Sequence, residues 1–599
     1  MSEKGSERFQ VDLSGIISVL SKHLYSTPRV AFRELLQNGV DAISARKLLD
    51  PKHEGSIHFE IIPGDSCPTL VVEDNGIGLT EQEVHQFLAT IGGSSKRTEK
   101  SRAQDTFIGQ FGIGLLSCFV LSDEIVVITR SATSDDAPGI EWRGQGSGTY
   151  GVRILEGAHT PGTRVYLKIK PEYRDLCTPE MVRETLAEYG EFLPVAVELS
   201  VGDKREAITA KEAPWSNGSL PMMVQAELGE TGRRFFEENF IDMVPITSRK
   251  AGLDGIAFIS GQARSLQSKP RHRAYVRGML LSAEVEGLAP DWAVFVNVLA
   301  NTTKLHPTAS REAFVTDDLL DQAREDIGLC LLSYLHRLAQ HDRNRLVQII
   351  RIHSLALKSL ALENDDVLRL IAPWLEFETS LGHMTFQEIL KHKGSSFCTS
   401  VDRFRQLAAI AAAEGRCLIN AGYVFEADLM QALAQEYPDA GLEELSAMDF
   451  SDQLDELDAD EAASYEALLD AAGEVLDTHR CRVEVRSFQP ASLPILYVQN
   501  DAADSRRALE KSAESADDFF ASILGDISGR ITQDAWNVCY LNAQNTLIQK
   551  LARVRDSKRL RVTVEVLYLQ ALLLGRYPLN NRELRQLSDG LVQLVEFGL

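Results

Sequence analysis

Three short segments in the first 120 residues carry the side chains and glycines needed for phosphate chemistry. They read Glu34-Leu-Leu-Gln-Asn-Gly-Val-Asp41, then Asp74-Asn-Gly-Ile-Gly78, then Gly109-Gln-Phe-Gly-Ile-Gly114. A carboxylate can act as a general base, an amide oxygen can bind a hard metal ion, a second carboxylate can accept from a purine amine, and glycines can lie close to phosphates. Together the three segments predict a pocket that binds and hydrolyses ATP.

The first segment predicts a helix with one polar face, because Glu34, Asn38 and Asp41 are spaced by about one helical turn. Glu34 is the carboxylate that we expect to orient or deprotonate water. Asn38 is the expected ligand of Mg²⁺, which takes only one or two protein oxygens when phosphates and water supply the rest. Asp41 lies on the same face and is assigned to the nucleotide site with them. The alternative for this segment alone is an exposed polar helix face.

The second segment follows Thr69-Leu-Val-Val-Glu73, a run typical of a strand. Asp74 would then lie at the end of the strand, where its carboxylate can accept a hydrogen bond from adenine N6. Gly76 and Gly78 would let the backbone approach a flat ring. In isolation, the alternative is an ordinary Asp-Asn-Gly hairpin turn.

The third segment has the glycine spacing G-x-x-G-x-G, the reverse of the dinucleotide fingerprint, and the chain contains no G-x-x-x-x-G-K-[ST] motif. It leads directly into Leu115-Leu-Ser-Cys-Phe-Val120, a plausible helix start whose free N–H groups and dipole favour phosphate. The alternative is a flexible connector. We assign the whole segment to phosphate binding: Gly109, Gln110, Phe111, Gly112, Ile113 and Gly114.

These segments resemble the Bergerat-type ATPase pocket shared by DNA gyrase B, the mismatch-repair protein MutL, histidine kinases and the ninety-kilodalton heat-shock chaperones. The sequence around these motifs most resembles the heat-shock protein 90 family, including its bacterial high-temperature-protein-G branch. Three segments resemble the sequences of this family most strongly: Phe32-Arg-Glu-Leu-Leu-Gln-Asn-Gly-Val-Asp-Ala42, Ile108-Gly-Gln-Phe-Gly-Ile-Gly114 and Pro161-Gly-Thr-Arg-Val165.

The resemblance implies further site residues. Thr163 would join Asp74 at the adenine through water, and residues 90–108 would form a lid over ATP, with Thr90 among the nucleotide-binding residues. Ala309-Ser-Arg-Glu-Ala313 resembles part of the family's middle domain, which implies that Arg311 reaches the γ-phosphate as an arginine finger in cis. From the residues alone, Ser-Arg-Glu is a capped helix start with a solvated arginine.

Three departures from the family's usual pattern lie close to these motifs. Phe87 stands near the start of the lid where the family usually has Asn, and Thr308 and Val315 flank Arg311 where the family usually has Asn and Gln. Thr308 and Val315 predict weaker polar support for Arg311 and slow turnover, whereas Phe87 predicts altered nucleotide affinity and lid kinetics.

The predicted architecture is α+β and α/β multidomain. It comprises a Bergerat-fold ATPase sandwich over 1–205, an α/β middle domain over 206–455 that supplies the catalytic arginine, and a mainly helical dimerisation domain over 456–599. The expected homodimer forms through a terminal helix whose apolar residues share one face, with the alternative that this helix packs inside its own domain. That face consists of Leu587, Leu591, Leu594 and Val595.

Composition disfavours several other classes of protein. The 599 residues are 44% hydrophobic and 25% charged, and a net charge of −24 disfavours a general affinity for nucleic acid.

No apolar run reaches membrane-spanning length, and the polar start of the chain does not resemble a secretory signal, so we expect a cytoplasmic protein without membrane partners. Eight cysteines without a C-x-x-C pair indicate a reducing compartment. Because the sequence ends Glu596-Phe-Gly-Leu599, without an acidic tail, we expect no co-chaperones that bind such a tail.

The predicted function is that of an ATP-dependent, stress-response chaperone, which couples Mg²⁺-dependent ATP hydrolysis to a dimeric clamp around unfolded client proteins. Two alternatives remain open. One is an ATPase of this fold that acts on DNA, as MutL and gyrase B do. The other is a nucleotide-binding scaffold with little turnover.

Overall fold

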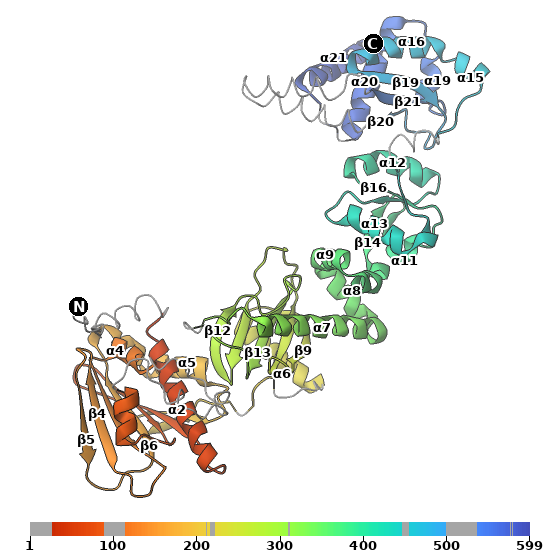
Figure 1. The fold of residues 1–599 in the computed structure, drawn as a ribbon. Coiled ribbons are helices and arrows are strands. Elements are labelled where there is room, and N and C mark those ends of the chain that lie inside the picture. Colours follow the sequence, from red (N-terminus) through yellow and green to blue (C-terminus); the bar gives the residue numbers. More distant parts are fainter. Residues whose placement is uncertain are drawn as a thin grey trace, which may run out of the picture. The chain divides into compact units, whose positions relative to one another are not determined.

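The computed structural model describes residues 27–88, 114–210, 212–215, 222–308, 312–445, 454–498, 536–575, 577 and 579–598. The chain divides into two compact units, residues 1–342 and residues 343–599. Figure 1 traces the elements of each. The three-domain boundaries after residues 205 and 455 remain predictions. Among the described residues, no helix combines the length and apolarity needed to span a membrane.

The first unit begins with an eight-stranded sheet in the order β5-β4-β3-β6-β2-β1-β7-β8. Neighbouring strands are antiparallel except for the parallel pair β1 and β7. The strands are β1 (Ser56–Ile62), β2 (Thr69–Asp74), β3 (Glu124–Arg130), β4 (Gly139–Gln145), β5 (Tyr150–Leu155), β6 (Gly162–Lys168), β7 (Ala196–Val201) and β8 (Lys204–Ala207). Alternate residues of β3 are buried, as expected for a strand with one face on the core.

Two long helices pack with this sheet, α2 (Val30–Leu49) and α5 (Pro179–Gly190). The sequence starts α5 with a capping residue, because the Thr178 hydroxyl accepts from the Met181 N–H at 3.4 Å and proline follows at the first helical position. Shorter helical turns complete the region: α3 (Glu81–Glu83), η2 (Val84–Leu88), η5 (Gly114–Ser117), α4 (Cys118–Leu121) and η6 (Pro171–Cys177).

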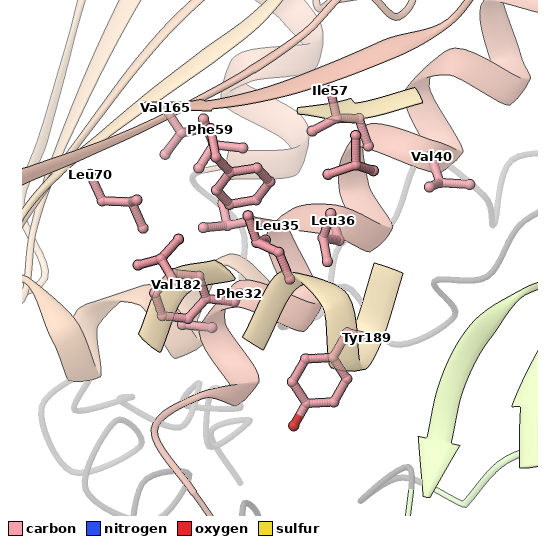
Figure 2. Packing of buried hydrophobic residues seen from close by; sticks show 14 of the residues in the cluster. Phe32, Leu35, Leu36, Val40, Ile57, Phe59, Leu70, Val165, Val182 and Tyr189 are labelled. Atoms are coloured by element: carbon pink, nitrogen blue, oxygen red, sulfur yellow. The ribbon is translucent and has the colours of Figure 1, made fainter. Parts of the chain in front are cut away.

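The core of the first unit lies between α2, α5 and the sheet. Phe32, Leu35 and Leu36 of α2 recur at helical spacing and are buried. Figure 2 shows their packing with residues of the sheet and of α5. The labelled partners are Ile57, Phe59, Leu70, Val165, Val182 and Tyr189. Because the same buried cluster continues into a second sheet, the first unit has one continuous core.

The second sheet of this unit has the order β12-β11-β13-β10-β9. Its strands are β9 (Phe240–Ser248), β10 (Leu253–Ser260), β11 (His272–Val276), β12 (Met279–Val285) and β13 (Val296–Thr302). Helix α6 (Met222–Phe236) precedes it, and α7 (Asp318–His341) follows it and packs against β9. The Asp317 carboxylate caps α7 by accepting from the N–H groups of Leu319 and Leu320 at 3.1 and 3.0 Å.

The second unit begins with three consecutive helices, α8 (Arg343–Ile352), α9 (Ser354–Glu363) and α10 (Asp365–Ile371), followed by the 3-10 turn η7 (Ala372–Trp374). A five-stranded sheet follows in the order β15-β14-β17-β16-β18. Its strands are β14 (Glu376–Thr379), β15 (Gly382–Thr385), β16 (Ser396–Cys398), β17 (Leu418–Asn420) and β18 (Glu443–Glu444). The helices between them are α11 (Phe386–Ile389), α12 (Val401–Ala413), α13 (Glu426–Glu436) and η8 (Pro438–Ala440).

The C-terminal part of the second unit combines helices with a small sheet in the order β19-β21-β20. The strands are β19 (Cys481–Arg486), β20 (Ile495–Val498) and β21 (Asn537–Asn542). The helical elements are α15 (Ala459–Ala463), α16 (Glu466–Leu476), η9 (Asp477–His479), α19 (Thr546–Leu551), α20 (Ser557–Leu574) and α21 (Asn581–Gly598). The predicted mixture of sheets and many helices is confirmed, and this part contains a sheet that the sequence reading did not anticipate.

Gly162 at the start of β6 provides a stability test within the first sheet. Its φ is +137°, and an added Cβ would lie 2.2 Å from the Asp74 carbonyl oxygen. Gly162→Ala should therefore cost about 1–3 kcal/mol and lower the unfolding midpoint of the first unit by several degrees in calorimetry of the full chain. The matched control is Gly151→Ala in β5, where an added Cβ meets nothing within 4 Å. Equal midpoints for both variants would contradict the close approach.

Candidate active site

Three neighbouring strands place Asp74, Thr163 and Thr129 in one row. Asp74 of β2 is the register partner of Thr163 of β6, and Thr163 is the register partner of Thr129 of β3. The hydroxyl oxygens of the two threonines lie 3.1 Å apart, and the Thr129 hydroxyl also donates to the Gly162 carbonyl at 3.1 Å and accepts from the Leu79 N–H at 2.9 Å. The Thr163 side chain is therefore held beside Asp74 by a buried neighbour.

The Asp74 carboxyl is surrounded by backbone donors. Its Oδ1 accepts from the Gly76 N–H at 2.8 Å, and the Thr163 N–H also interacts with this carboxyl. The pKa of Asp74 is raised to about 7, mainly by burial and also by the nearby charge of Glu73. The two N–H groups and the charge of Arg46 act in the opposite direction. Near neutral pH, this carboxyl can change between an acceptor-only carboxylate and a neutral acid.

The loop after Asp74 is fixed by hydrogen bonds to residues 54–56 and to α2. The Asn75 side chain accepts from the Ser56 N–H at 2.8 Å and donates to the Glu54 carbonyl at 2.9 Å. The Ile77 N–H donates to the Ala42 carbonyl of α2 at 2.9 Å. These contacts hold the predicted adenine-binding turn against the helix that carries Glu34.

Glycine is required where the loop meets α2 and where it meets the end of β3. An added Cβ on Gly76 would lie 2.5 Å from the Ala42 Cβ and 2.7 Å from Asp74 Oδ1. Gly78 has φ +64°, and an added Cβ there would lie 1.9 Å from the Arg130 carbonyl oxygen. The two glycines of the Asp-Asn-Gly-Ile-Gly motif therefore permit a close approach that no other residue permits.

Helix α2 divides its polar residues between the interior and the surface. Glu34 and Asp41 are buried, whereas Asn38 is exposed between them in sequence. The Glu34 carboxylate lies 3.8 Å from the guanidinium of buried Arg33, which in turn lies over the Tyr189 ring, 5.9 Å from its centroid. The structure thus brings a buried carboxylate and an exposed amide onto the helix that the motif predicted.

Gly114 connects Glu34 to the end of the glycine segment. An added Cβ on Gly114 would lie 2.5 Å from Glu34 Oε2, and the Ser117 hydroxyl donates to the Gly114 carbonyl at 2.7 Å. Burial and the charge of Glu34 raise the pKa of Cys118 to about 12, so this thiol remains neutral beside the carboxylate. The first residue of η5 therefore contacts the predicted catalytic base directly.

The structure describes the residues on either side of Arg311, up to Thr308 and from Glu312 onward. Pro307 and Phe314 form an antiparallel bridge, the Val315 N–H donates to the His306 carbonyl at 2.8 Å, and the Thr308 N–H donates to the Ala313 carbonyl at 2.9 Å. The Thr308 hydroxyl also donates to the Ala313 carbonyl, at 3.2 Å. Thr308 therefore closes the base of this loop, although it departs from the family's usual residue.

Part of the predicted site lies outside the described residues. These positions are Thr90, Gly109, Gln110, Phe111, Gly112, Ile113 and Arg311. The described part brings together the row around Asp74 and the α2 residues around Glu34. Within the described ranges, no group of three or more His, Cys, Asp or Glu side chains forms a metal cluster.

Two residues with structural importance were missed by the sequence reading. Thr129 occupies an ordinary buried position of an alternating strand, and nothing in its local pattern marks it. Arg46 lies in the last turn of α2, where a basic residue is usual, yet its guanidinium donates to the Asn75 carbonyl at 2.7 Å. A basic residue at a helix end gives no signal of such a contact.

Comparison with known proteins points to the same region. Residues 25–143 match the family model described as histidine kinase-, DNA gyrase B-, and HSP90-like ATPase. The matched range contains Glu34, Asn38, Asp41, Asp74 and the glycine segment that ends at Gly114.

Similar relatives include proteins named chaperone protein HtpG. The chain is 25% identical to that of Ruthia magnifica subsp. Calyptogena magnifica over 411 residues, which are 63% of this chain and 65% of the relative. It is 25% identical to that of Oleidesulfovibrio alaskensis over 368 residues, which are 58% of this chain and 56% of the relative. For Yersinia pestis (strain Pestoides F) the identity is 25% over 414 residues, which are 63% and 65% of the two chains.

The chain thus spans just under two thirds of these relatives at most. The matches confirm the predicted resemblance to the heat-shock protein 90 family and its HtpG members. Asp74 and the helix that carries Glu34 both lie within residues 25–143, the range that is similar to the histidine kinase-, DNA gyrase B- and HSP90-like ATPase family.

Proposed function

We propose that this chain is an ATP-dependent molecular chaperone, which hydrolyses ATP with Mg²⁺ and acts as a cytoplasmic homodimer on unfolded client proteins. The observation that carries the proposal is the Asp74 carboxyl, which is held by two backbone N–H groups beside the Thr163 hydroxyl and against the helix of Glu34. A carboxylate fixed in this way presents an acceptor to the exocyclic amine of adenine, and Thr163 supplies a hydroxyl for a bridging water.

The hydrolytic step is assigned to Glu34 and Arg311. Glu34 is buried on α2 against Gly114, where a carboxylate can orient and deprotonate water. Arg311 lies between stems that are joined by the Pro307 and Phe314 bridge, and as an arginine finger it would stabilise charge on the transferring phosphoryl group. Its neighbour Glu312 acts electrostatically on Tyr189 of α5, whose ring lies next to the Arg33 guanidinium of α2.

The residues present fit ATP and Mg²⁺. Gly76 approaches Ala42 and Gly114 approaches Glu34 so closely that only a hydrogen atom fits, which packs both glycine segments against α2 beside the proposed nucleotide site. Asn38 offers an exposed amide oxygen on the helix of Glu34, and Mg²⁺ prefers oxygen ligands shared with phosphates. When bound, Mg²⁺ would neutralise charge on the phosphate oxygens. Asp41 and the 109–113 segment remain assigned to the nucleotide site.

The dimer is assigned to α21. The apolar residues of this helix form two sets. Leu587 and Leu594 are half-buried, and Leu587 packs on the core formed with α20. Leu591 and Val595 are 50% and 62% exposed. Leu584 and Val592 are also exposed, so an apolar stripe at i, i+7, i+8 and i+11 stays uncovered within one chain. Burying this stripe against a second copy would remove a large apolar area from water.

The active-site assignment predicts that binding and chemistry separate by residue. Glu34→Ala and Arg311→Ala should bind ATP with near wild-type affinity, because neither touches the base. They should hydrolyse it on the order of 10²-fold more slowly or worse, because each acts on the transition state. Asp74→Asn should bind far more weakly, because the amide can present N–H₂ to the adenine amine. Calorimetry measures binding, and a phosphate-release assay measures turnover.

The control is Asp65→Asn, an exposed carboxylate of the same domain with no role in the pocket. Wild-type affinity in Asp74→Asn would refute the adenine assignment. Salt-sensitive DNA binding that stimulates turnover would favour the DNA-acting ATPase, and tight ATP binding without hydrolysis in the wild type would favour the scaffold. Faster turnover with an unfolded client would support the chaperone.

The dimer assignment predicts that charge on the exposed stripe separates the subunits. Leu591→Asp combined with Val595→Asp should raise the dimer dissociation constant by about 10²-fold or more, because each buried Leu or Val contributes roughly 1.5–3 kcal/mol. Cutting the chain after Arg582, which removes most of α21, should likewise give a monomer that still binds ATP. Light scattering across protein concentration measures the change.

The matched control is Asp589→Lys, an exposed charge reversal on the polar side of α21. It should leave the dissociation constant unchanged. A double variant that remains dimeric at wild-type concentrations would show that the subunits meet elsewhere.

A further inference from the structure

Arg46 contacts the two loops that surround Asp74. It lies one helical turn beyond Ala42, whose carbonyl accepts from the Ile77 N–H at 2.9 Å. Its Nη1 donates to the Asn75 carbonyl at 2.7 Å and lies 3.4 Å from the carbonyls of Gly76 and Pro161. One guanidinium nitrogen therefore joins α2 to the turn after β2 and to the turn before β6.

The shortest of these contacts is part of a two-step hydrogen-bond chain. The Asn75 carbonyl and the Gly76 N–H belong to the same peptide group. Arg46 donates to the oxygen of this peptide at 2.7 Å, and the N–H of the same peptide donates to Asp74 Oδ1 at 2.8 Å. A cation on the carbonyl side polarises a peptide and strengthens the hydrogen bond that its N–H donates.

We propose that Arg46 is a positioning residue for the base end of the nucleotide pocket. It fixes and polarises the Asn75–Gly76 peptide so that the Asp74 side chain stays in place as a carboxylate that accepts from a purine amine. Arg46 acts through this peptide and through its charge, and it does not touch the base. The inference rests on the proposed function, because it assigns the Asp74 carboxylate to the base of a bound nucleotide.

The charges around Asp74 determine the direction of the effect. Glu73 precedes it on β2 and pairs with Arg164 of β6 at 2.5 Å, and Arg46 faces it from α2. Burial and Glu73 raise the pKa of Asp74, whereas the Gly76 and Thr163 N–H groups and Arg46 lower it. Loss of Arg46 should therefore move this pKa above 7, so that a smaller fraction of Asp74 is ionised at neutral pH.

The test is the pH dependence of ADP affinity in Arg46→Met, measured by calorimetry on the full chain between pH 6 and pH 9. If the pKa of Asp74 rises by about one unit, affinity at pH 7 should fall about fivefold, and at pH 9 it should return to within about twofold of wild type. Turnover at saturating ATP should change little. Arg46→Lys, which keeps a cationic donor, should show a smaller shift in the same direction.

Two controls separate this role from simple loss of structure. Arg183→Met removes an exposed arginine that pairs with Glu206 on β8, and it should leave the pH profile unchanged. In a protein that already carries Asp74→Asn, adding Arg46→Met should cause no further pH-dependent loss of ADP affinity. The titration of ADP itself affects all variants equally. An equal loss at every pH, or no loss, would overturn the proposal. If the wild type binds no ADP at any pH, the proposed function itself fails.

Discussion

The hydrogen bond from the Gly76 N–H to the Asp74 carboxyl is the interaction on which the candidate site depends. It places a carboxyl at the end of β2, in a position where burial alone would favour the neutral acid. Gly76 packs closely on Ala42 because this turn lies so near to α2, and Gly78, with its positive φ, closely approaches the Arg130 carbonyl at the end of β3. The carboxyl, the turn and the helix therefore form one structural arrangement.

Helix α2 serves the core and the site at the same time. Phe32, Leu35 and Leu36 bury one side of it in the core of the first unit, and Figure 2 shows this packing. Glu34 lies between Phe32 and Leu35 in the sequence, and Asn38 follows Leu36 on the same helix. Apolar packing of the helix, and not a flexible loop, therefore fixes the positions of both residues. A catalytic carboxylate on a packed helix loses little entropy when substrate binds.

Much of this arrangement could be predicted from sequence, for local reasons. The polar spacing of Glu34 and Asn38 follows from helix geometry, and Asp74 follows a strand-like run that ends in glycines. Thr129 and Arg46 could not be predicted, because their roles depend on which strands are neighbours and on where a loop crosses a helix. The small C-terminal sheet was missed for a similar reason, since β19 and β21 are far apart in sequence.

The most direct measurement of the central claim compares ATP with purine riboside triphosphate, which lacks the exocyclic amine. If Asp74 accepts from that amine, calorimetry on the full chain should find ATP bound about 10- to 100-fold more tightly, because removal of the amine leaves a buried acceptor without its donor. In Asp74→Asn the preference should disappear. Equal affinities of the wild type for the two nucleotides would contradict the account of this site.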